Sequence, residues 1–363
     1  MVSEMSSRER IASLLRIEEA DRIGFADSPW RETIDRWETE GLPKGIFIHQ
    51  HFGLDIYGIG VDPSPKYDSI TYEEGENWRL VRDSYGVKQR TWRDRSGVPL
   101  PVEAAVKNLE EFRSRIEPML DPDSPIRISS GDYPFKEDIS KIVSNFQKRF
   151  FVPANVLGPY EYARHICGGH KGVLKAMITD KPFADRMFRV LGNFLSRLAQ
   201  GLLEAGVDGL FLFDDMGFVD GPFFRPETYE RYLLPAHRAI CLPFKKKGLP
   251  RILHTDGNVE ALIPGIMKAG FTVLQPLEAK AGMDVVKLKE QYGDRLAFMG
   301  NIDARILSTN DPEKILAEVR RKVEAAAPGG GYILGSDHSV PPSVSLETFK
   351  FFSSLPSKIG RYG

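Results

Sequence analysis

Five apolar segments in the second half of the chain each end in polar residues, and this arrangement limits the possible folds more than any other feature. The segments cover residues 209–215, 251–258, 272–278, 296–303 and 332–338. Between consecutive segments lies enough chain for one helix and two short loops. This is the repeat of a (β/α)8 barrel, which gathers the C-terminal ends of its strands into one ring and carries its chemistry there. The sequence therefore predicts an α/β TIM barrel whose mouth is lined by carboxylates and histidines.

The N-terminal part of the chain is predicted to elaborate this barrel. Residues 62–103 carry alternating charged segments with turn-forming glycines, a pattern typical of a small antiparallel sheet inserted before the barrel proper. The 363 residues, 42% of them apolar, can fill one large barrel core or two ordinary domains. We expect a single barrel domain over residues 1–363. Pro235 is expected to kink the helix predicted over residues 226–247.

The balance of charge and the cysteine count argue against several classes of protein. With 49 basic and 50 acidic residues, the chain has a net charge of −1, so nucleic acid is not an expected partner. Its apolar stretches are too short to span a membrane, and the N-terminus lacks an apolar signal core. The two cysteines, Cys167 and Cys241, predict a cytoplasmic protein without a disulfide framework or a Cys-rich zinc site. The sequence leaves homodimer formation open.

Three polar residues at strand ends form a candidate metal site. His254 and Asp256 are two residues apart, so both side chains project to the same face of the strand. His338 follows the last strand, which closes the barrel beside the first. Imidazole and carboxylate ligands at a common mouth suit zinc. The alternative is that His254 hydrogen-bonds to Asp256 or to a neighbouring loop and only orders the mouth.

Three acidic residues are candidates for catalysis. Asp214 and Asp215 end an otherwise uncharged strand and, being adjacent, point to opposite sides. One is expected to face the barrel axis, and the other to cap the next helix or to pair with a base. Glu278 is a candidate general base or further metal ligand. The alternative for Glu278 is a salt bridge to Lys280 or Arg295.

Other residues are candidates for contact with a substrate. Residues 25–60 are rich in aromatic side chains, among them Trp30, which either cap the barrel core or form a pocket wall. Asn301, which follows another strand, is a candidate for orienting the substrate. Residues 165–170 place a cysteine between two histidines, but glycines surround the thiol, and packing is the favoured interpretation there.

The second half of the chain resembles the uroporphyrinogen decarboxylase superfamily, which includes the methyltransferases of cobalamin-dependent methyl transfer. The matching segments are residues 204–208, 213–215, 226–229, 234–235, 254–258, 282–284, 292–294, 300–303 and 335–341. The resemblance implies a (β/α)8 barrel, in agreement with the pattern of strand ends.

Departures from the family pattern distinguish between its branches. The decarboxylases carry an Arg-Gln-Ala-Gly-Arg-Tyr stretch that holds the substrate carboxylates, whereas residues 29–37 here read PWRETIDRW. A tetrapyrrole with many carboxylates needs several guanidinium or amide partners, so porphyrin decarboxylation is disfavoured. In the thiol-methylating branch, zinc is bound by a His-x-Cys pair and a second Cys, at positions that resemble His254, Asp256 and His338. Nitrogen and carboxylate ligands leave the ion a harder Lewis acid that suits oxygen.

The resemblance therefore implies the demethylating half of a corrinoid system. The hypothesis is transfer of a methyl group from a small O-methyl donor, such as a methoxylated aromatic, to cob(I)alamin. His254, Asp256 and His338 would hold Zn²⁺, and Asp214 or Asp215 would orient the substrate or protonate the departing oxygen. The corrinoid-binding fingerprint Asp-x-His-x-x-Gly is absent, so the cofactor is expected on a partner corrinoid protein.

Two alternatives belong to other classes. The first is a metal-independent decarboxylase of a small aromatic or pyrrole carboxylic acid, with Asp214 and His338 as acid and base. The second is a catalytically silent barrel that binds a corrinoid partner or a small ligand.

Overall fold

Eight parallel strands form one curled sheet in the computed structural model, which describes residues 4–93, 99–124 and 136–362. Their spatial order is β1-β14-β13-β12-β11-β8-β7-β2. The strands are β1 (Gly24–Phe25), β2 (Ile59–Gly60), β7 (Pro153–Leu157), β8 (Gly209–Phe213), β11 (Arg251–His254), β12 (Val273–Gln275), β13 (Ala297–Met299) and β14 (Tyr332–Leu334). This sheet confirms the predicted TIM barrel, and the five predicted strand segments contain β8, β11, β12, β13 and β14.

Asp55 joins the two edges of the curled sheet. Its backbone N–H donates to the carbonyl of Phe25 at 2.7 Å, and its carboxylate accepts the backbone N–H of Phe25 at 2.8 Å. Phe25 ends β1, and Asp55 lies in the segment that leads to β2. The carboxylate is buried and pairs with Arg10 at 2.9 Å and with Arg22 at 3.1 Å. One buried side chain therefore links both edge strands to the N-terminal helix.

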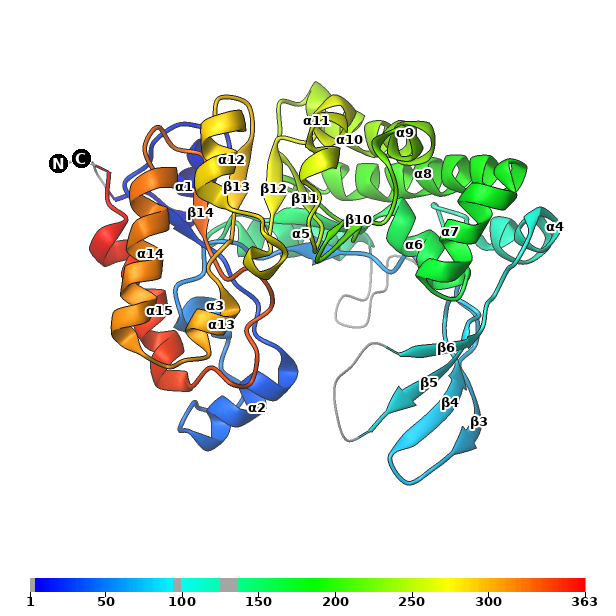
Figure 1. The fold of residues 1–363 in the computed structure, drawn as a ribbon, viewed down its shortest axis with the longest axis horizontal. Coiled ribbons are helices and arrows are strands. Elements are labelled where there is room, and N and C mark those ends of the chain that lie inside the picture. The colour runs from blue at the N-terminus through cyan, green and yellow to red at the C-terminus, as the bar shows by residue number, and fades with distance from the viewer. Residues whose placement is uncertain (1–3, 94–98, 125–135, 363) are drawn as a thin grey trace.

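Helices follow the strands and cover the outside of the sheet (Figure 1). Among them are α6 (Pro159–Ile166), α7 (His170–Thr179), α8 (Lys181–Glu204), α10 (Leu234–Lys246), α12 (Val285–Tyr292), α14 (Pro312–Ala326) and α15 (Leu346–Ile359). The α8 helix illustrates how the sequence specifies them. The side chain of Asp180 accepts the N–H of Phe183 at the N-terminus, and Met187, Leu191 and Leu195 are buried at helical spacing.

Further helices and helical turns complete the connections. They are α1 (Ser7–Leu14), α2 (Arg31–Thr39), α3 (Ile48–His51), α4 (Leu109–Glu111), α5 (Lys136–Phe146), α9 (Pro226–Thr228), α11 (Ile263–Ala269), α13 (Ala304–Leu307), the π-helices η1 (Phe112–Ile116) and η4 (Tyr229–Leu233), and the 3₁₀ turns η2 (Glu117–Met119), η5 (Glu260–Leu262) and η6 (Ala279–Ala281). Pro235 lies in the first turn of α10, directly after η4. The helix predicted over residues 226–247 is thus interrupted by a π-helical turn before its proline.

A separate four-stranded antiparallel sheet projects from the rest of the fold (Figure 1). It consists of β3 (Ile70–Glu74), β4 (Trp78–Arg82), β5 (Lys88–Trp92) and β6 (Leu100–Glu103) in sequence order. The guanidinium of Arg90 lies 4.4 Å from the ring centre of Trp78, and the two side chains come from adjacent strands. This sheet confirms the antiparallel elaboration predicted within residues 62–103.

A small hairpin of β9 (Gly217–Phe218) and β10 (Gly221–Pro222) follows β8. Within the described ranges, no helix combines the length and the apolar character that a membrane crossing requires.

Candidate metal centre and substrate cavity

The C-terminal ends of the barrel strands surround a cavity of about 460 Å³. Its polar lining residues are Asp27, Ser28, His49, Asn155, His254, Asp256, Gln275, Ser336, His338 and Ser339. Its apolar wall includes Ile56, Phe211, Phe213 and Met299. Because these residues come from strands that are far apart in sequence, the cavity exists only when the barrel has formed. This is the position at which TIM barrels carry out chemistry.

Asp215, His254 and Asp256 form a compact cluster at this mouth. Each offers one ligand atom, and these three atoms all lie within 4.8 Å of one another. The Nε2 atom of His254 is 3.5 Å from Oδ1 of Asp215 and 3.8 Å from Oδ1 of Asp256. The backbone N–H of Asp256 also donates to Oδ1 of Asp215 at 3.1 Å, which holds the two strand ends together.

The other ring nitrogen of His254 sets the orientation of its imidazole. Nδ1 lies 2.5 Å from Oε1 of Gln275, an oxygen that can only accept, so Nδ1 carries the proton. The lone pair of Nε2 then faces the carboxylates of Asp215 and Asp256. Three electron-rich atoms that converge without a proton between them fit a cation.

The electrostatics of the two carboxylates differ. Burial raises the pKa of Asp215, and the nearby charge of Asp256 adds to this effect. Burial also acts to raise the pKa of Asp256, but the hydrogen bond from the side chain of His338 brings it below its ordinary value. Oδ1 of Asp256 is buried and has no hydrogen-bond partner among the described residues. This unpaired oxygen, together with the nitrogen and oxygen donor set, fits a divalent metal ion.

His338 borders the cluster through Asp256. Its Nε2 atom lies 3.5 Å from Oδ2 of Asp256, and this contact raises the pKa of the imidazole. The indole of Trp30 meets the ring of His338 edge-on, with centroids 5.8 Å apart, and Trp30 is 41% exposed at the rim. Of the predicted ligands, His254 and Asp256 thus belong to the cluster, His338 is one contact away, and Asp215 completes the group.

The structure places Asp214 away from the cavity. Its side chain is fully buried, with Oδ2 2.7 Å from Nε2 of His237 and Oδ1 accepting the N–H of Glu161 at 2.7 Å. The predicted catalytic pair is therefore divided. Asp215 joins the metal cluster, whereas Asp214 caps the start of α6 and pairs with a buried histidine.

Glu278 and Asn301 brace the loops around the mouth. Glu278 accepts the N–H of Gly257 at 2.8 Å and pairs with Lys280 at 2.6 Å, which is the salt bridge considered as its alternative. Asn301 is fully buried, and its amide bonds to three backbone groups within residues 277–285. Neither residue is among those that line the cavity, so the geometry favours loop positioning over catalysis or substrate contact.

Sequence reasoning did not select Asp27 and Asn155. Asp27 follows β1, accepts hydrogen bonds from Oγ and N–H of Ser336 at 2.7 and 3.0 Å, and has its pKa raised to about 6 by burial. Asn155 lies within β7, and its buried Oδ1 has no hydrogen-bond partner in the ranges that the structure describes. The strand-end rule that selected Asp256 could have selected Asp27, because residues 22–27 also read as a strand. No pattern in the sequence marks Asn155.

The aromatic-rich residues 25–60 divide between core and cavity. Trp37 and Phe52 are buried in the core, where Trp37 stacks on Phe349 from α15 and Phe52 meets the same ring edge-on. His49 lines the cavity, and burial lowers the pKa of its imidazole to about 4. In the 165–170 segment, Cys167 is buried with Sγ 3.8 Å from Sδ of Met187, which agrees with packing.

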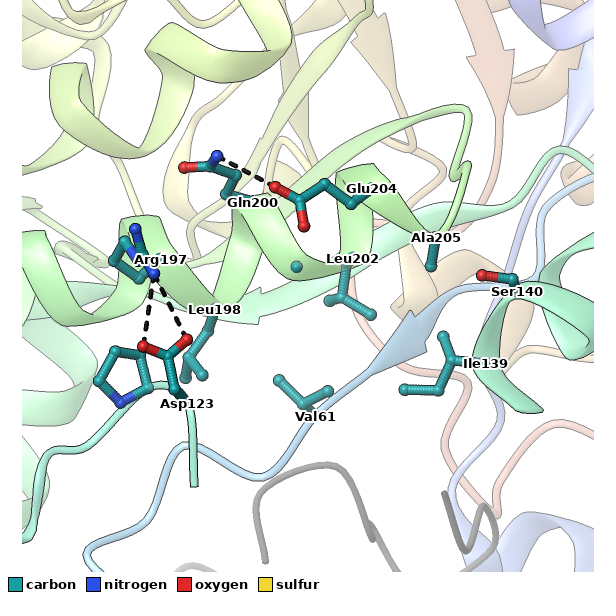
Figure 2. Close-up of a pocket in the computed structure, with 12 residues that line it drawn as sticks. Val61, Asp123, Ile139, Ser140, Arg197, Leu198, Gln200, Leu202, Glu204 and Ala205 are labelled. Atoms are coloured by element: carbon teal, nitrogen blue, oxygen red, sulfur yellow. Dashed lines mark hydrogen bonds and ion pairs between the residues drawn. The ribbon is translucent and has the colours of Figure 1, made fainter. Parts of the chain in front are cut away.

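A second cavity, of about 250 Å³, lies on the outer side of α8 (Figure 2). Its polar groups pair with one another, Arg197 with Asp123 at 3.4 Å and Gln200 with Glu204 at 3.1 Å. Apart from Val61, which follows β2, its described lining comes from helices and loops and contains no histidine, so we assign the chemistry to the barrel mouth.

Comparison with known proteins agrees with this architecture. Residues 109–357 match the family described as Uroporphyrinogen decarboxylase (URO-D). The chain belongs to this family. A uroporphyrinogen decarboxylase of Methylibium petroleiphilum is 28% identical over 200 residues, 48% of each chain. One of Syntrophotalea carbinolica is 26% identical over 280 residues, 70% of this chain and 76% of that one.

The chain spans about half the length of the Methylibium family member and of most other curated relatives that it matches. A methyltransferase from Methanosarcina mazei has the same fold. It is 17% identical, and the alignment covers 98% of this chain and 99% of that one with a TM-score of 0.67.

Proposed function

We propose that this member of the URO-D family is a metal-dependent methyltransferase of a corrinoid system. It would pass a methyl group from a small O-methyl donor to cob(I)alamin on a partner corrinoid protein. The observation that carries the proposal is the convergence of Asp215, His254 and Asp256 at the mouth, with ligand atoms within 4.8 Å of one another. The fold shared with a methyltransferase supports it.

Asp215, His254 and Asp256 would hold the ion, for which Zn²⁺ is our candidate. When bound, the ion supplies a Lewis acid that polarises the donor oxygen. Gln275 keeps the imidazole of His254 in the tautomer that presents Nε2. His338 holds Asp256 in place from the opposite side of the cluster.

The cavity would position the donor beside this cluster. The stacked rings of Phe211 and Phe213, 4.5 Å apart, form its apolar wall, and Phe213 lies 5.2 Å from the ring of His254. In the transfer, the oxygen–methyl bond breaks, the methyl group leaves without the bonding pair, and the oxygen keeps that pair and takes up a proton. Asp27 is our candidate proton donor, because it lines the cavity and burial raises its pKa to about 6.

Decarboxylation is the second candidate, since the curated relatives carry the name uroporphyrinogen decarboxylase. The geometry favours it less. Arg31 and Arg36, from the region that corresponds to the decarboxylase clamp, pair on the surface with Asp35 and Glu40 at 2.8 and 2.6 Å. Neither lines the cavity, so neither is placed to receive a substrate carboxylate there.

A transfer assay with free cob(I)alamin tests the proposal. We expect the zinc-supplied wild-type protein to form methylcobalamin from a methoxylated aromatic donor, which is followed by its absorption spectrum. His254→Ala should lower the rate at least about 100-fold, whereas His51→Ala, at an exposed histidine in α3, should retain it. Turnover that His254→Ala leaves unchanged, or release of carbon dioxide from a pyrrole acid by the metal-free protein, would contradict the proposal.

A further inference from the structure

Among the described residues that line the cavity at the barrel mouth, the imidazole of His338 is the one side chain with a raised pKa that could carry a positive charge, and it already pairs with Asp256. The described lining of the cavity includes carboxylates, imidazoles and amides but no lysine or arginine. The charges of Lys280 and Arg164 affect the carboxylates of the metal cluster from outside the cavity lining, and each of these side chains already has a carboxylate partner. Lys280 pairs with Glu278 at 2.6 Å, and Nε of Arg164 bonds to Glu161 at 2.8 Å. A ligand carboxylate in the part of the cavity away from the metal cluster would therefore lose its hydration without gaining a lysine or arginine partner.

Asn155, on the strand β7, offers an unused acceptor two strands away from His254. Its Oδ1 is buried and has no hydrogen-bond partner within the described part of the chain, and β7 holds it between β2 and β8. Gly58 leaves space for this amide, because a Cβ there would lie 2.1 Å from Oδ1. A buried oxygen without a donor is costly, so a ligand hydroxyl or N–H that reaches it is favoured.

The neighbouring wall is flat and apolar. Phe211 and Phe213 project from β8, the strand next to Asn155, and their rings are inclined by only 25° to each other. Ile56 and Met299 are buried and add further apolar side chains to the cavity lining. Such a surface suits the face of an aromatic ring. A volume of about 460 Å³ lies in the lower part of the range of small-molecule sites, which favours one ring with its substituents.

We propose that the methyl donor is a neutral, one-ring aromatic ether with a free hydroxyl group, and that this hydroxyl donates a hydrogen bond to Oδ1 of Asn155. The ring lies against Phe211 and Phe213, and the ether oxygen faces the metal cluster. This inference rests on the proposed methyl transfer, because only that reaction makes the ligand a methyl donor. Its binding preferences concern only the shape and charge of the cavity.

Calorimetric titration of the full-length, zinc-supplied protein with two matched pairs of ligands tests the inference. The first pair is 4-hydroxy-3-methoxybenzyl alcohol and 4-hydroxy-3-methoxybenzoate, which differ in charge. The second pair is 2-methoxyphenol and 1,2-dimethoxybenzene, which differ in the free hydroxyl. We expect the alcohol to bind at least about tenfold more tightly than the carboxylate. We expect 2-methoxyphenol to bind more tightly than its dimethoxy counterpart.

The role of Asn155 is tested by the same titrations on Asn155→Ala. The variant should weaken binding of 2-methoxyphenol roughly two- to tenfold, the range of one neutral hydrogen bond, and should leave 1,2-dimethoxybenzene unchanged. Gly58→Ala displaces the amide of Asn155 without removing it, so it should also weaken the binding of 2-methoxyphenol. Asn193→Ala on α8 is the matched control and should change neither ligand. A thermal melt of each variant verifies that it is folded.

The inference would be overturned if the carboxylate bound as tightly as the alcohol or more tightly. It would also be overturned if Asn155→Ala weakened the binding of 2-methoxyphenol and of 1,2-dimethoxybenzene by the same factor. Absence of saturable binding by all four ligands would also overturn it. Failure of the transfer proposal has a different signature. In that case the neutral phenols would bind with the expected preference, but no methyl group would reach cob(I)alamin.

Discussion

The Nε2 atom of His254 lies 3.5 Å from Oδ1 of Asp215, although the two residues belong to different β-α units. The contact follows from the register of the sheet, because β11 pairs in parallel with β8 and places His254 opposite Phe213, two residues before Asp215. On the other side, β12 places Gln275 opposite His254. Three adjacent strands therefore fix one imidazole between a carboxylate and an amide. This arrangement preorganises the imidazole as a metal ligand.

Removal of the amide tests this arrangement. In Gln275→Ala the imidazole of His254 loses the acceptor that fixes its tautomer and orientation, so we expect zinc affinity to fall by about 10- to 100-fold. Competition with a chromophoric chelator measures this affinity. Gln200→Ala on the outer side of α8 is the matched control and should bind zinc as the wild type does. Equal affinities for all three proteins would mean that Gln275 does not position the ligand.

Asp55 is expected to be essential for the stability of the barrel. Its buried carboxylate pairs with Arg10 and Arg22 and accepts the N–H of Phe25. Asp55→Ala leaves the buried Arg10 with the carboxylate of Asp21 alone and the buried N–H of Phe25 without this acceptor, which should lower the free energy of unfolding by at least about 2 kcal/mol. Urea denaturation followed by circular dichroism measures this change. Glu18→Ala removes the partner of Arg16 in an exposed ion pair and should cost less than about 1 kcal/mol; similar losses in both variants would refute the role of Asp55.

Asp27 should make the stability of the protein fall as pH rises. Its pKa is about 6 in the folded chain, against an ordinary value of 3.8, because burial disfavours its charged form. Between these values the folded state binds more protons than the unfolded state, so the free energy of unfolding decreases with pH through this window. Asp27→Asn removes the effect. Relative to the variant, the wild type should lose up to about 2 kcal/mol between pH 4.5 and pH 7.5, as measured by urea denaturation at both values.

The control for this prediction is Asp35→Asn, at an exposed aspartate paired with Arg31. It should follow the wild type at both pH values. If the difference between the wild type and Asp27→Asn is the same at pH 4.5 and pH 7.5, Asp27 does not titrate in the expected window.

The sequence predicted the strand ends well because their signal is local. An apolar run followed by a polar residue marks a parallel strand wherever both faces of the sheet are covered. His254 and Asp256 were identified in this way, and the structure brings them together. The sequence could not show that Asp215, and not Asp214, faces the barrel mouth. Alternation shows that Asp214 and Asp215 point apart, but only the packing of His237 from α10 against Asp214 determines which one faces inward.

Other features depend on contacts that no local pattern encodes. Asn155 becomes an unpaired acceptor only because β2 and β8 flank it in the closed sheet. The sequence left two roles for Glu278, catalysis or a salt bridge, and the proximity of Lys280 in the folded loop favours the salt bridge. His338 was expected among the ligands, yet the loop after β14 brings it to the far side of Asp256. In each case the deciding geometry comes from a loop or a neighbouring strand and not from the residue's own segment.

The central claim is that Asp215, His254 and Asp256 form one metal site, and stoichiometric metal analysis tests it most directly. We expect the wild-type protein, after equilibration with Zn²⁺ and gel filtration, to retain about one ion per chain. His254→Ala and Asp215→Ala should each retain little, whereas His51→Ala and Asp35→Ala should retain the wild-type amount. Wild-type protein that retains no zinc, or loses none of it when His254 and Asp215 are replaced, would contradict the account.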